Sequence, residues 1–76
     1  MTVNEMTPGQ KAKVKTIKKG VQGQRKLFEM GLVPGTELKL ISRHPFNGPV
    51  VLEIGRTRLA LGRGMADAVE VELLQN

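Results

Sequence analysis

One segment constrains the fold of this chain more than any other: LFEMGLVPG, from Leu27 to Gly35. Gly31 follows a helix-compatible run and can adopt the left-handed backbone conformation with which many helices end. Pro34 fixes its own φ angle and Gly35 supplies a positive φ, so this pair predicts a tight turn into a strand. The segment contains no nucleophile, general base or cluster of metal ligands. It therefore predicts how a helix docks on a small sheet and indicates no chemistry.

Alternating apolar and polar residues, or runs rich in β-branched residues, predict five short strands. These strands cover Lys11 to Lys15, Thr36 to Ser42, Val50 to Ile54, Thr57 to Leu61 and Val69 to Leu73. In the first strand the lysines face water, and Ile17 breaks the phase, as at a bulge or a strand end. Gly55-Arg56 is short enough to form the hairpin turn between the third and fourth strands.

One helix is predicted from Gln22 to Met30, with Gly31 as its stop signal. Leu27 and Met30 lie three residues apart, so one face of this helix can pack on a sheet. The connection from Gly62 to Asp67 is expected to hold at most one helical turn. With no parallel crossovers, the predicted fold is mainly β: a small SH3-like antiparallel barrel of about five strands with one short helix.

Length and composition limit the classes of function. Seventy-six residues predict a single domain with one small core, in which residues 1–6 are expected to be flexible. The absence of cysteine excludes disulfides and thiolate metal sites and suits a reducing cytoplasm. No apolar run is long enough to span a membrane, and the first residues lack the pattern of a secretory signal.

Candidate catalytic and metal-binding residues are too scattered to form a site. His44 is the only histidine and follows Arg43, whose charge disfavours a bound cation, so we predict no metal site there. Glu70 and Glu72 share one face of the last strand, where they are expected to balance neighbouring lysines. Ser42 is the only serine and has no evident base or orienting partner. The sequence therefore predicts no catalytic residues, no cofactor and no enzyme activity.

Basic residues are the strongest functional signal. Twelve Lys and Arg against seven Asp and Glu give a formal net charge of +5, which favours an anionic partner or a solvated surface. Lys11, Lys13 and Lys15 point to the same side of the first strand, as in a stripe that tracks phosphates. Only Phe28 and Phe46 are aromatic, however, so no stacking platform accompanies the charges. This argues against nucleic acid and favours an acidic protein surface.

The chain resembles the FeoA family, small cytosolic components of bacterial ferrous iron uptake, over nearly its whole length. The resemblance rests on the LFEMGLVPG helix end, the loop Pro45 to Val50, the Leu59 to Leu61 strand and the closing Val69 to Val71. The family's hairpin usually carries Gly-Asp-Pro where this chain has Asn47-Gly48-Pro49. After the position of Leu61, members of the family often continue with charged, helix-forming residues, whereas this chain has Gly62-Arg63-Gly64. The same module also resembles the C-terminal SH3-like domain of DtxR-type metal-dependent repressors.

The resemblance to FeoA implies a non-catalytic cytoplasmic adaptor, recruited to the inner face of the membrane by the cytosolic, GTP-binding part of the FeoB transporter. The side chains expected to contact that partner surround the helix: Lys18, Lys19, Gln24, Arg25, Lys26, Leu27, Met30 and Leu32. The spacing of the apolar members, and of Val33, favours core packing, whereas partial exposure would make them a contact patch.

Two alternatives to the adaptor stay open at this point. One is a KOW-like basic barrel that binds nucleic acid. The other is a stand-alone metal-responsive regulatory domain that binds ferrous iron weakly through His44.

Overall fold

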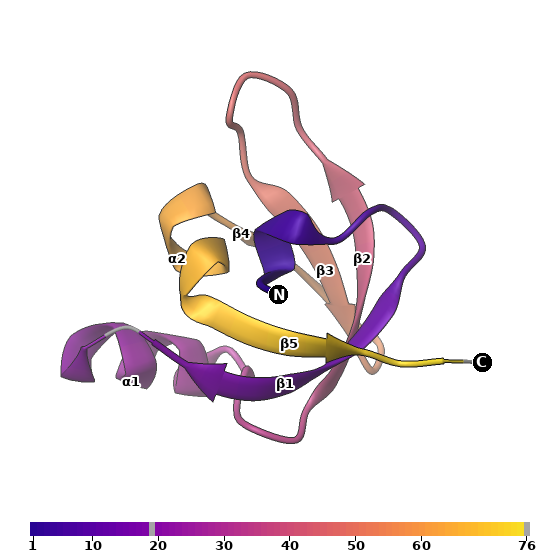
Figure 1. The fold of residues 1–76 in the computed structure, drawn as a ribbon. Helices are drawn as coiled ribbons and strands as arrows, with labels where there is room; N and C mark the ends of the chain where they lie inside the picture. Colours follow the sequence, from indigo (N-terminus) through magenta and orange to yellow (C-terminus); the bar gives the residue numbers. More distant parts are fainter. Residues whose placement is uncertain (19, 76) are drawn as a thin grey trace.

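The structure, a computed structural model, describes residues 1–18 and 20–75, without the side chains of Val21 and Gln22. Its elements follow one another along the chain as a 3₁₀ helix, a strand, a helix, three strands, a helix and a last strand (Figure 1). They are η1 (Val3–Glu5), β1 (Lys11–Ile17), α1 (Val21–Glu29), β2 (Glu37–Arg43), β3 (Val50–Ile54), β4 (Thr57–Leu61), α2 (Arg63–Ala68) and β5 (Val69–Leu73).

The five strands form one sheet in the order β4-β3-β2-β1-β5, and each neighbouring pair is antiparallel. The predicted bounds of β3, β4 and β5 match those observed. The bounds of β2 differ by one residue at each end, and β1 continues two residues further, to Ile17. The mainly β, antiparallel fold class is therefore confirmed. Period-two alternation was a reliable signal here because one face of every strand is buried.

Two irregularities in pairing bend the sheet around its core. The β1–β5 register shifts between Val14 and Thr16, and the β2–β3 register shifts between Leu40 and Ser42. An extra residue in one strand increases the local twist and bend, which lets a small sheet curl over itself. The bulge in β1 lies just before Ile17, the residue at which the strand ends.

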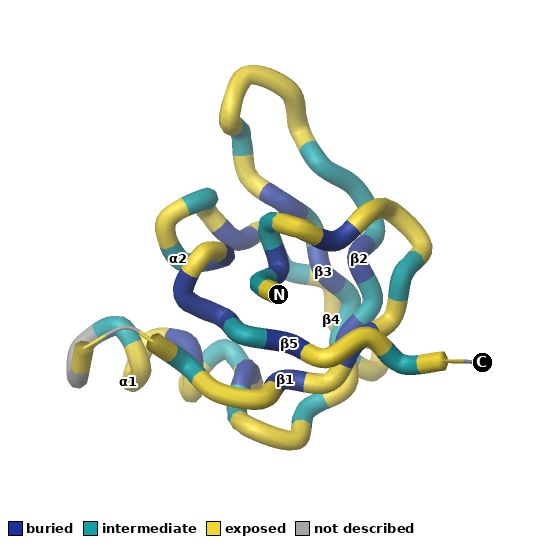
Figure 2. The backbone as a smooth tube through the Cα atoms, viewed as in Figure 1, coloured by how far each residue is buried: buried dark blue, intermediate teal, exposed yellow. Residues whose placement is uncertain are grey.

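The core fills the concave side of the curled sheet (Figure 2). Ala12 and Val14 point inward from β1 while the lysines between and beside them are exposed, as predicted. The other strands contribute inward-facing aliphatic side chains in the same alternation: Leu38, Leu40, Val50, Leu52, Leu61, Val69 and Val71. Burial of such side chains is the main source of stability in a domain of this size.

The first six residues, which the sequence predicts to be flexible, pack against the core in the structure. Val3 and Met6 are fully buried, and Thr2 forms an isolated bridge with Glu70. The Arg43 guanidinium donates to the Met6 carbonyl at 2.8 Å. Two apolar side chains three residues apart close one end of the core, but a pattern this short gives no detectable periodicity in the sequence.

The connection after β4 is more structured than predicted. It forms the six-residue helix α2, which buries Ala66 and Ala68. The Asn4 amide joins α2 to the N-terminal segment by donating to the Arg63 carbonyl at 3.0 Å and to Asp67 Oδ1 at 2.6 Å. Gly62 and Gly64 disfavour a helix on local propensity alone, and packing against η1 overrides that preference.

Helix α1 ends in a Schellman motif centred on Gly31, as the sequence predicted. Gly31 has a φ of +90°, and its N–H donates to the Phe28 carbonyl at 2.9 Å. The Leu32 N–H reaches back to the Leu27 carbonyl, also at 2.9 Å, and both leucine side chains are fully buried. These two bonds satisfy carbonyl groups that a helix end leaves free, and the paired leucines fix the direction in which the chain leaves the helix.

We predict that Gly31→Ala lowers the free energy of unfolding by about 1–2 kcal/mol, because a Cβ opposes the left-handed conformation. The cost is purely conformational, since a Cβ at Gly31 would meet no atom within 4 Å. Gly64→Ala is the matched control: this glycine lies inside α2, also has open space, and should leave stability unchanged or raise it by up to about 1 kcal/mol. Urea unfolding of the two variants measures the difference, and equal effects would contradict the assignment.

Candidate functional site

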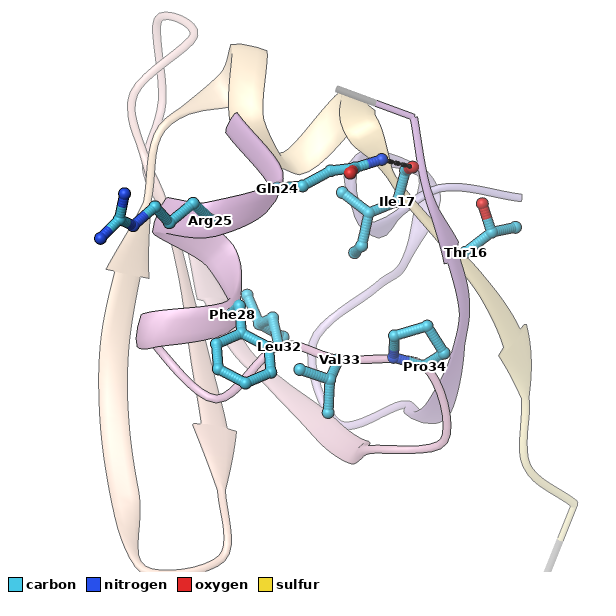
Figure 3. Close-up of a pocket in the computed structure, with 8 residues that line it drawn as sticks. All are labelled: Thr16, Ile17, Gln24, Arg25, Phe28, Leu32, Val33 and Pro34. Carbon is cyan, nitrogen blue, oxygen red and sulfur yellow. Dashed lines mark hydrogen bonds between the residues drawn. The ribbon is translucent and has the colours of Figure 1, made fainter. Parts of the chain in front are cut away.

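A groove of about 500 Å³ lies between α1, the end of β1 and the turn that follows α1 (Figure 3). Its surface is mostly apolar, with side chains from all three segments: Ile17, Phe28, Leu32, Val33 and Pro34. Three polar residues complete the rim: Thr16, Gln24 and Arg25. A groove of this kind is better suited to binding a protein segment or another apolar ligand than to catalysis, because an active site needs convergent polar groups.

Phe28 is a large apolar side chain of the groove that is exposed. Consecutive residues on a helix point about 100° apart, so the rotation that buries Leu27 turns Phe28 outward. The Phe28 side chain is 68% exposed and lies beside Leu32 and Val33 in Figure 3. An exposed aromatic ring next to the half-buried Val33 makes a contiguous apolar patch, which is typical of interaction sites.

The predicted polar contact residues lie on or beside this groove. Gln24 donates from Nε2 to the Ile17 carbonyl at 3.2 Å, which ties α1 to the end of β1. Arg25 and Lys26 are exposed on α1, and Arg25 Nε lies 3.5 Å from Glu29 Oε1 one turn later. Exposed ion pairs of this geometry contribute little to stability, so these charges remain available to a partner. The expected contact at Lys19 lies outside the described residues.

The predicted apolar contact residues belong mainly to the core. Leu27 and Leu32 are fully buried, so Leu27 has no surface to offer and Leu32 forms only the floor of the groove. Met30 is partly buried and packs against the core. The core-packing alternative therefore holds for the two leucines. Val33 is half-buried and lines the groove, which fits a contact patch.

Sequence reasoning missed Phe28 as a site residue. The only available signal was negative: Phe28 lies outside the face defined by Leu27 and Met30, so a large aromatic side chain was left without a place in the core. The end of β1 was missed for another reason. Its position beside α1 follows from how the chain packs and not from any local pattern.

The lysines of β1 do not form an isolated positive stripe. In the sheet register Glu53 lies between Lys39 and Arg58, and Arg58 Nε is 3.2 Å from Glu53 Oε2. A second row across β2, β1 and β5 consists of Glu37, Lys13 and Glu72. Acidic residues on both sides of the central lysine weaken the attraction of this face for phosphates.

Metal-ligating side chains do not gather anywhere in the part of the chain that the structure describes. Among residues 1–18 and 20–75 no group of three His, Cys, Asp or Glu residues is placed to hold an ion. His44 is exposed, directly after β2. Within the same residues, no helix combines the length and the hydrophobicity needed to cross a bilayer.

Comparison with known proteins identifies the family. The FeoA domain family matches residues 1–73, which is nearly the whole chain. The chain belongs to the FeoA family. The resemblance in the helix-end motif is thereby confirmed, and FeoA proteins are accessory proteins of ferrous iron transport.

Relatives and solved structures agree with this assignment. A candidate Fe(2+) transport protein A from Methanocaldococcus jannaschii is 36% identical over 64 residues, which cover 84% of this chain and 76% of the relative. A crystal structure described as the iron uptake regulatory protein FeoA has a TM-score of 0.87 at 36% identity, covering 97% of this chain and 96% of the other.

A second FeoA structure, from Stenotrophomonas maltophilia, confirms the SH3-like fold. It has a TM-score of 0.81 at 29% identity and covers 95% of this chain and 89% of the other. That protein was crystallised with zinc and is described as an SH3-domain protein and a candidate activating factor for bacterial ferrous iron transport. A manganese-dependent transcriptional repressor, at 23% identity and a TM-score of 0.88, shares the fold alone.

Glu70 carries the clearest electrostatic contact of this FeoA chain. The Lys18 ammonium lies 3.0 Å from Glu70 Oε2, and the N-terminal ammonium lies 3.2 Å from Oε1. Hydrogen bonding to Lys18, followed by that to the N-terminus, holds the pKa of Glu70 below its ordinary value. The expectation that Glu70 balances a lysine is confirmed, and the contact ties the end of β1 beside the groove to β5.

We predict that the Glu70 contact stabilises the fold at neutral pH and that this contribution disappears on acidification. Because the folded-state pKa is depressed, the contribution is present above the ordinary carboxylate pKa and is lost as pH falls through the lower folded-state value. Urea unfolding of wild type and Glu70→Gln from about pH 7 to about pH 3 should show the difference between them shrinking. Glu72→Gln is the control, because it removes the same charge from the same strand. A loss of stability that Glu70→Gln and Glu72→Gln share is due to the change in net charge. A pH-independent difference would contradict the prediction.

Proposed function

We propose that this FeoA chain is a non-catalytic adaptor that docks on the cytosolic part of a FeoB-type ferrous iron transporter. The observation that carries the proposal is the exposed apolar groove beside α1, with Phe28 68% exposed, in a chain of the FeoA family. Family membership supports a role in ferrous iron transport, and the groove supports contact with another protein. The proposal places the adaptor in the cytoplasm, recruited to the inner face of the membrane by its partner.

The ion pairs formed by acidic side chains support a non-catalytic role. Glu70 lies within 3.2 Å of both the Lys18 ammonium and the N-terminal ammonium, and Glu53 lies 3.2 Å from Arg58 Nε, so these two carboxylates take part in ion pairs. Groups that are engaged in this way stabilise local structure and are poor candidates for proton transfer to a substrate.

The proposed contact surface consists of the groove and the exposed polar residues around it. Gln24 and Arg25 line its rim, Lys18 and Lys26 are exposed close to the lining residues in sequence, and Met30 is partly exposed at the helix end. Cations around an apolar centre resemble the polar rim of a protein interface, where charge selects the partner and speeds association. A GTP-binding cytosolic domain with an acidic face would complement this surface.

We predict that Arg25→Glu combined with Lys26→Glu weakens binding to the purified cytosolic part of the transporter about tenfold, because both charges then repel an acidic partner. Isothermal titration calorimetry at low and moderate salt measures the affinity. Lys11→Glu combined with Arg56→Glu is the matched control, since it makes the same charge change at exposed positions of β1 and the β3–β4 turn and should have little effect.

Titrations of the same purified chain also test the two alternatives to the adaptor. Absence of saturable binding by the wild-type chain would overturn the adaptor. Tight RNA binding with a steep salt dependence would instead support the nucleic-acid-binding barrel. Stoichiometric ferrous iron binding under anaerobic conditions, lost in His44→Ala, would support the metal-responsive domain.

A further inference from the structure

Strand β1 is paired on both sides over only part of its length. Its register with β2 covers Lys11 to Lys13, and Val14 then bonds to the turn before β2 through the Thr36 carbonyl and the Gly35 N–H, each at 2.8 Å. On the other side, β5 continues to pair with β1 as far as Ile17. The last residues of β1 therefore have a strand on one side and the groove on the other (Figure 3).

The side chain of Gln24 stands where a further strand would pair. Its Nε2 donates to the Ile17 carbonyl at 3.2 Å, so a backbone acceptor at the end of β1 faces α1 and not β5. Gln24 is exposed, and an exposed hydrogen bond of this kind exchanges readily with water or with another donor. An incoming backbone N–H can replace the Gln24 amide without leaving the carbonyl unsatisfied. An open strand edge of this type is a template for an added strand.

The floor of the groove provides an anchor for a side chain. Phe28 and Val33 flank it, Pro34 lies at its far end beside β1, and Leu32 closes it from below (Figure 3). In an added strand alternate side chains point to the same side, so one apolar side chain would enter the groove and its neighbours would point outward.

Charge decides what kind of segment fits. From residue 15 to residue 34 the sequence has five basic residues and one acidic residue, Glu29. The basic residues are Lys15, Lys18, Lys19, Arg25 and Lys26. On the outer face of the sheet, by contrast, Glu37, Glu53 and Glu72 lie among the basic residues. Among the described residues that line the groove Arg25 alone is charged, and its exposed pair with Glu29 exchanges readily with another carboxylate, which favours an acidic occupant.

We infer that the groove between α1 and β1 binds an extended acidic segment, which adds a short strand to the open edge of β1 and places one apolar side chain against Phe28. This inference rests on the proposed function, because the segment is assigned to the cytosolic part of the transporter. It adds the binding mode: main-chain pairing supplies the register, the groove supplies the anchor and the basic rim selects acidic residues.

The first experiment titrates the purified cytosolic part of the transporter with wild type, Phe28→Asp and Phe46→Asp. Phe28→Asp should weaken binding at least tenfold, because it removes the anchor and places a negative charge beside an acidic segment. Phe46→Asp is the matched control: Phe46 is 98% exposed, on the β2–β3 loop, which projects away from α1 (Figure 1), and this change should alter affinity less than twofold. Both side chains are exposed, so both variants should fold, as circular dichroism and thermal unfolding would verify.

The second experiment uses overlapping 15-residue peptides that cover the transporter's cytosolic sequence. The peptide that binds should be acidic, and its amide chemical-shift changes in isotope-labelled protein should centre on Thr16, Ile17 and Phe28. Two versions of this peptide are then made, one N-methylated at odd-numbered and one at even-numbered backbone nitrogens. One version should lose binding and the other should keep it, because only every second nitrogen of an added strand faces β1.

The outcomes separate the inference from the function on which it rests. If the cytosolic part does not bind the wild-type chain, the proposed function fails and the inference fails with it. If it binds and Phe28→Asp has no effect, the function stands and the groove is excluded. Binding that needs Phe28 but that no peptide reproduces would assign the groove to a folded surface and overturn the added strand. A dimer of this chain that Phe28→Asp dissociates would assign it to a second copy.

Discussion

The Schellman motif at the end of α1 is the constraint on which the rest of the structure depends. Its two backbone bonds and the buried pair Leu27 and Leu32 hold the helix against the sheet at one fixed rotation. That rotation determines which side chains enter the core and which stay outside. Phe28 is exposed as a direct consequence, and the residues after Gly31 cross below it to form the floor of the groove.

The arrangement gives two surfaces with different electrostatic character. On the outer face of the sheet, antiparallel register sets acidic residues beside basic ones, as where Glu53 meets Arg58. Around α1, Arg25 stands at the rim of an apolar groove and Lys26 follows it on the exposed side of the helix. A domain of 76 residues has few side chains to spare for function beyond its core. An apolar groove with an exposed aromatic ring beside it suits a protein that acts by contact.

Much of the fold could be predicted because its signals are local. The β-branched run of β3, the alternation in β5 and the glycine at the end of α1 depend on neighbours in sequence, and the observed elements follow them. The N-terminal segment and α2 could not be predicted in this way. Each covers only a small part of the core with two apolar residues, such as Val3 and Met6, and the two segments contact each other.

By itself the sequence determined the strand pattern, the left-handed glycine stop and the family, since all three depend on residue order within short windows. It also placed Gln24, Arg25 and Lys26 at the surface of a helix. Only the tertiary structure decided that Phe28 faces a groove and that β1 extends past β2 into an open edge. Those properties depend on how α1 packs across the end of the sheet, a relation between distant segments that no local pattern encodes.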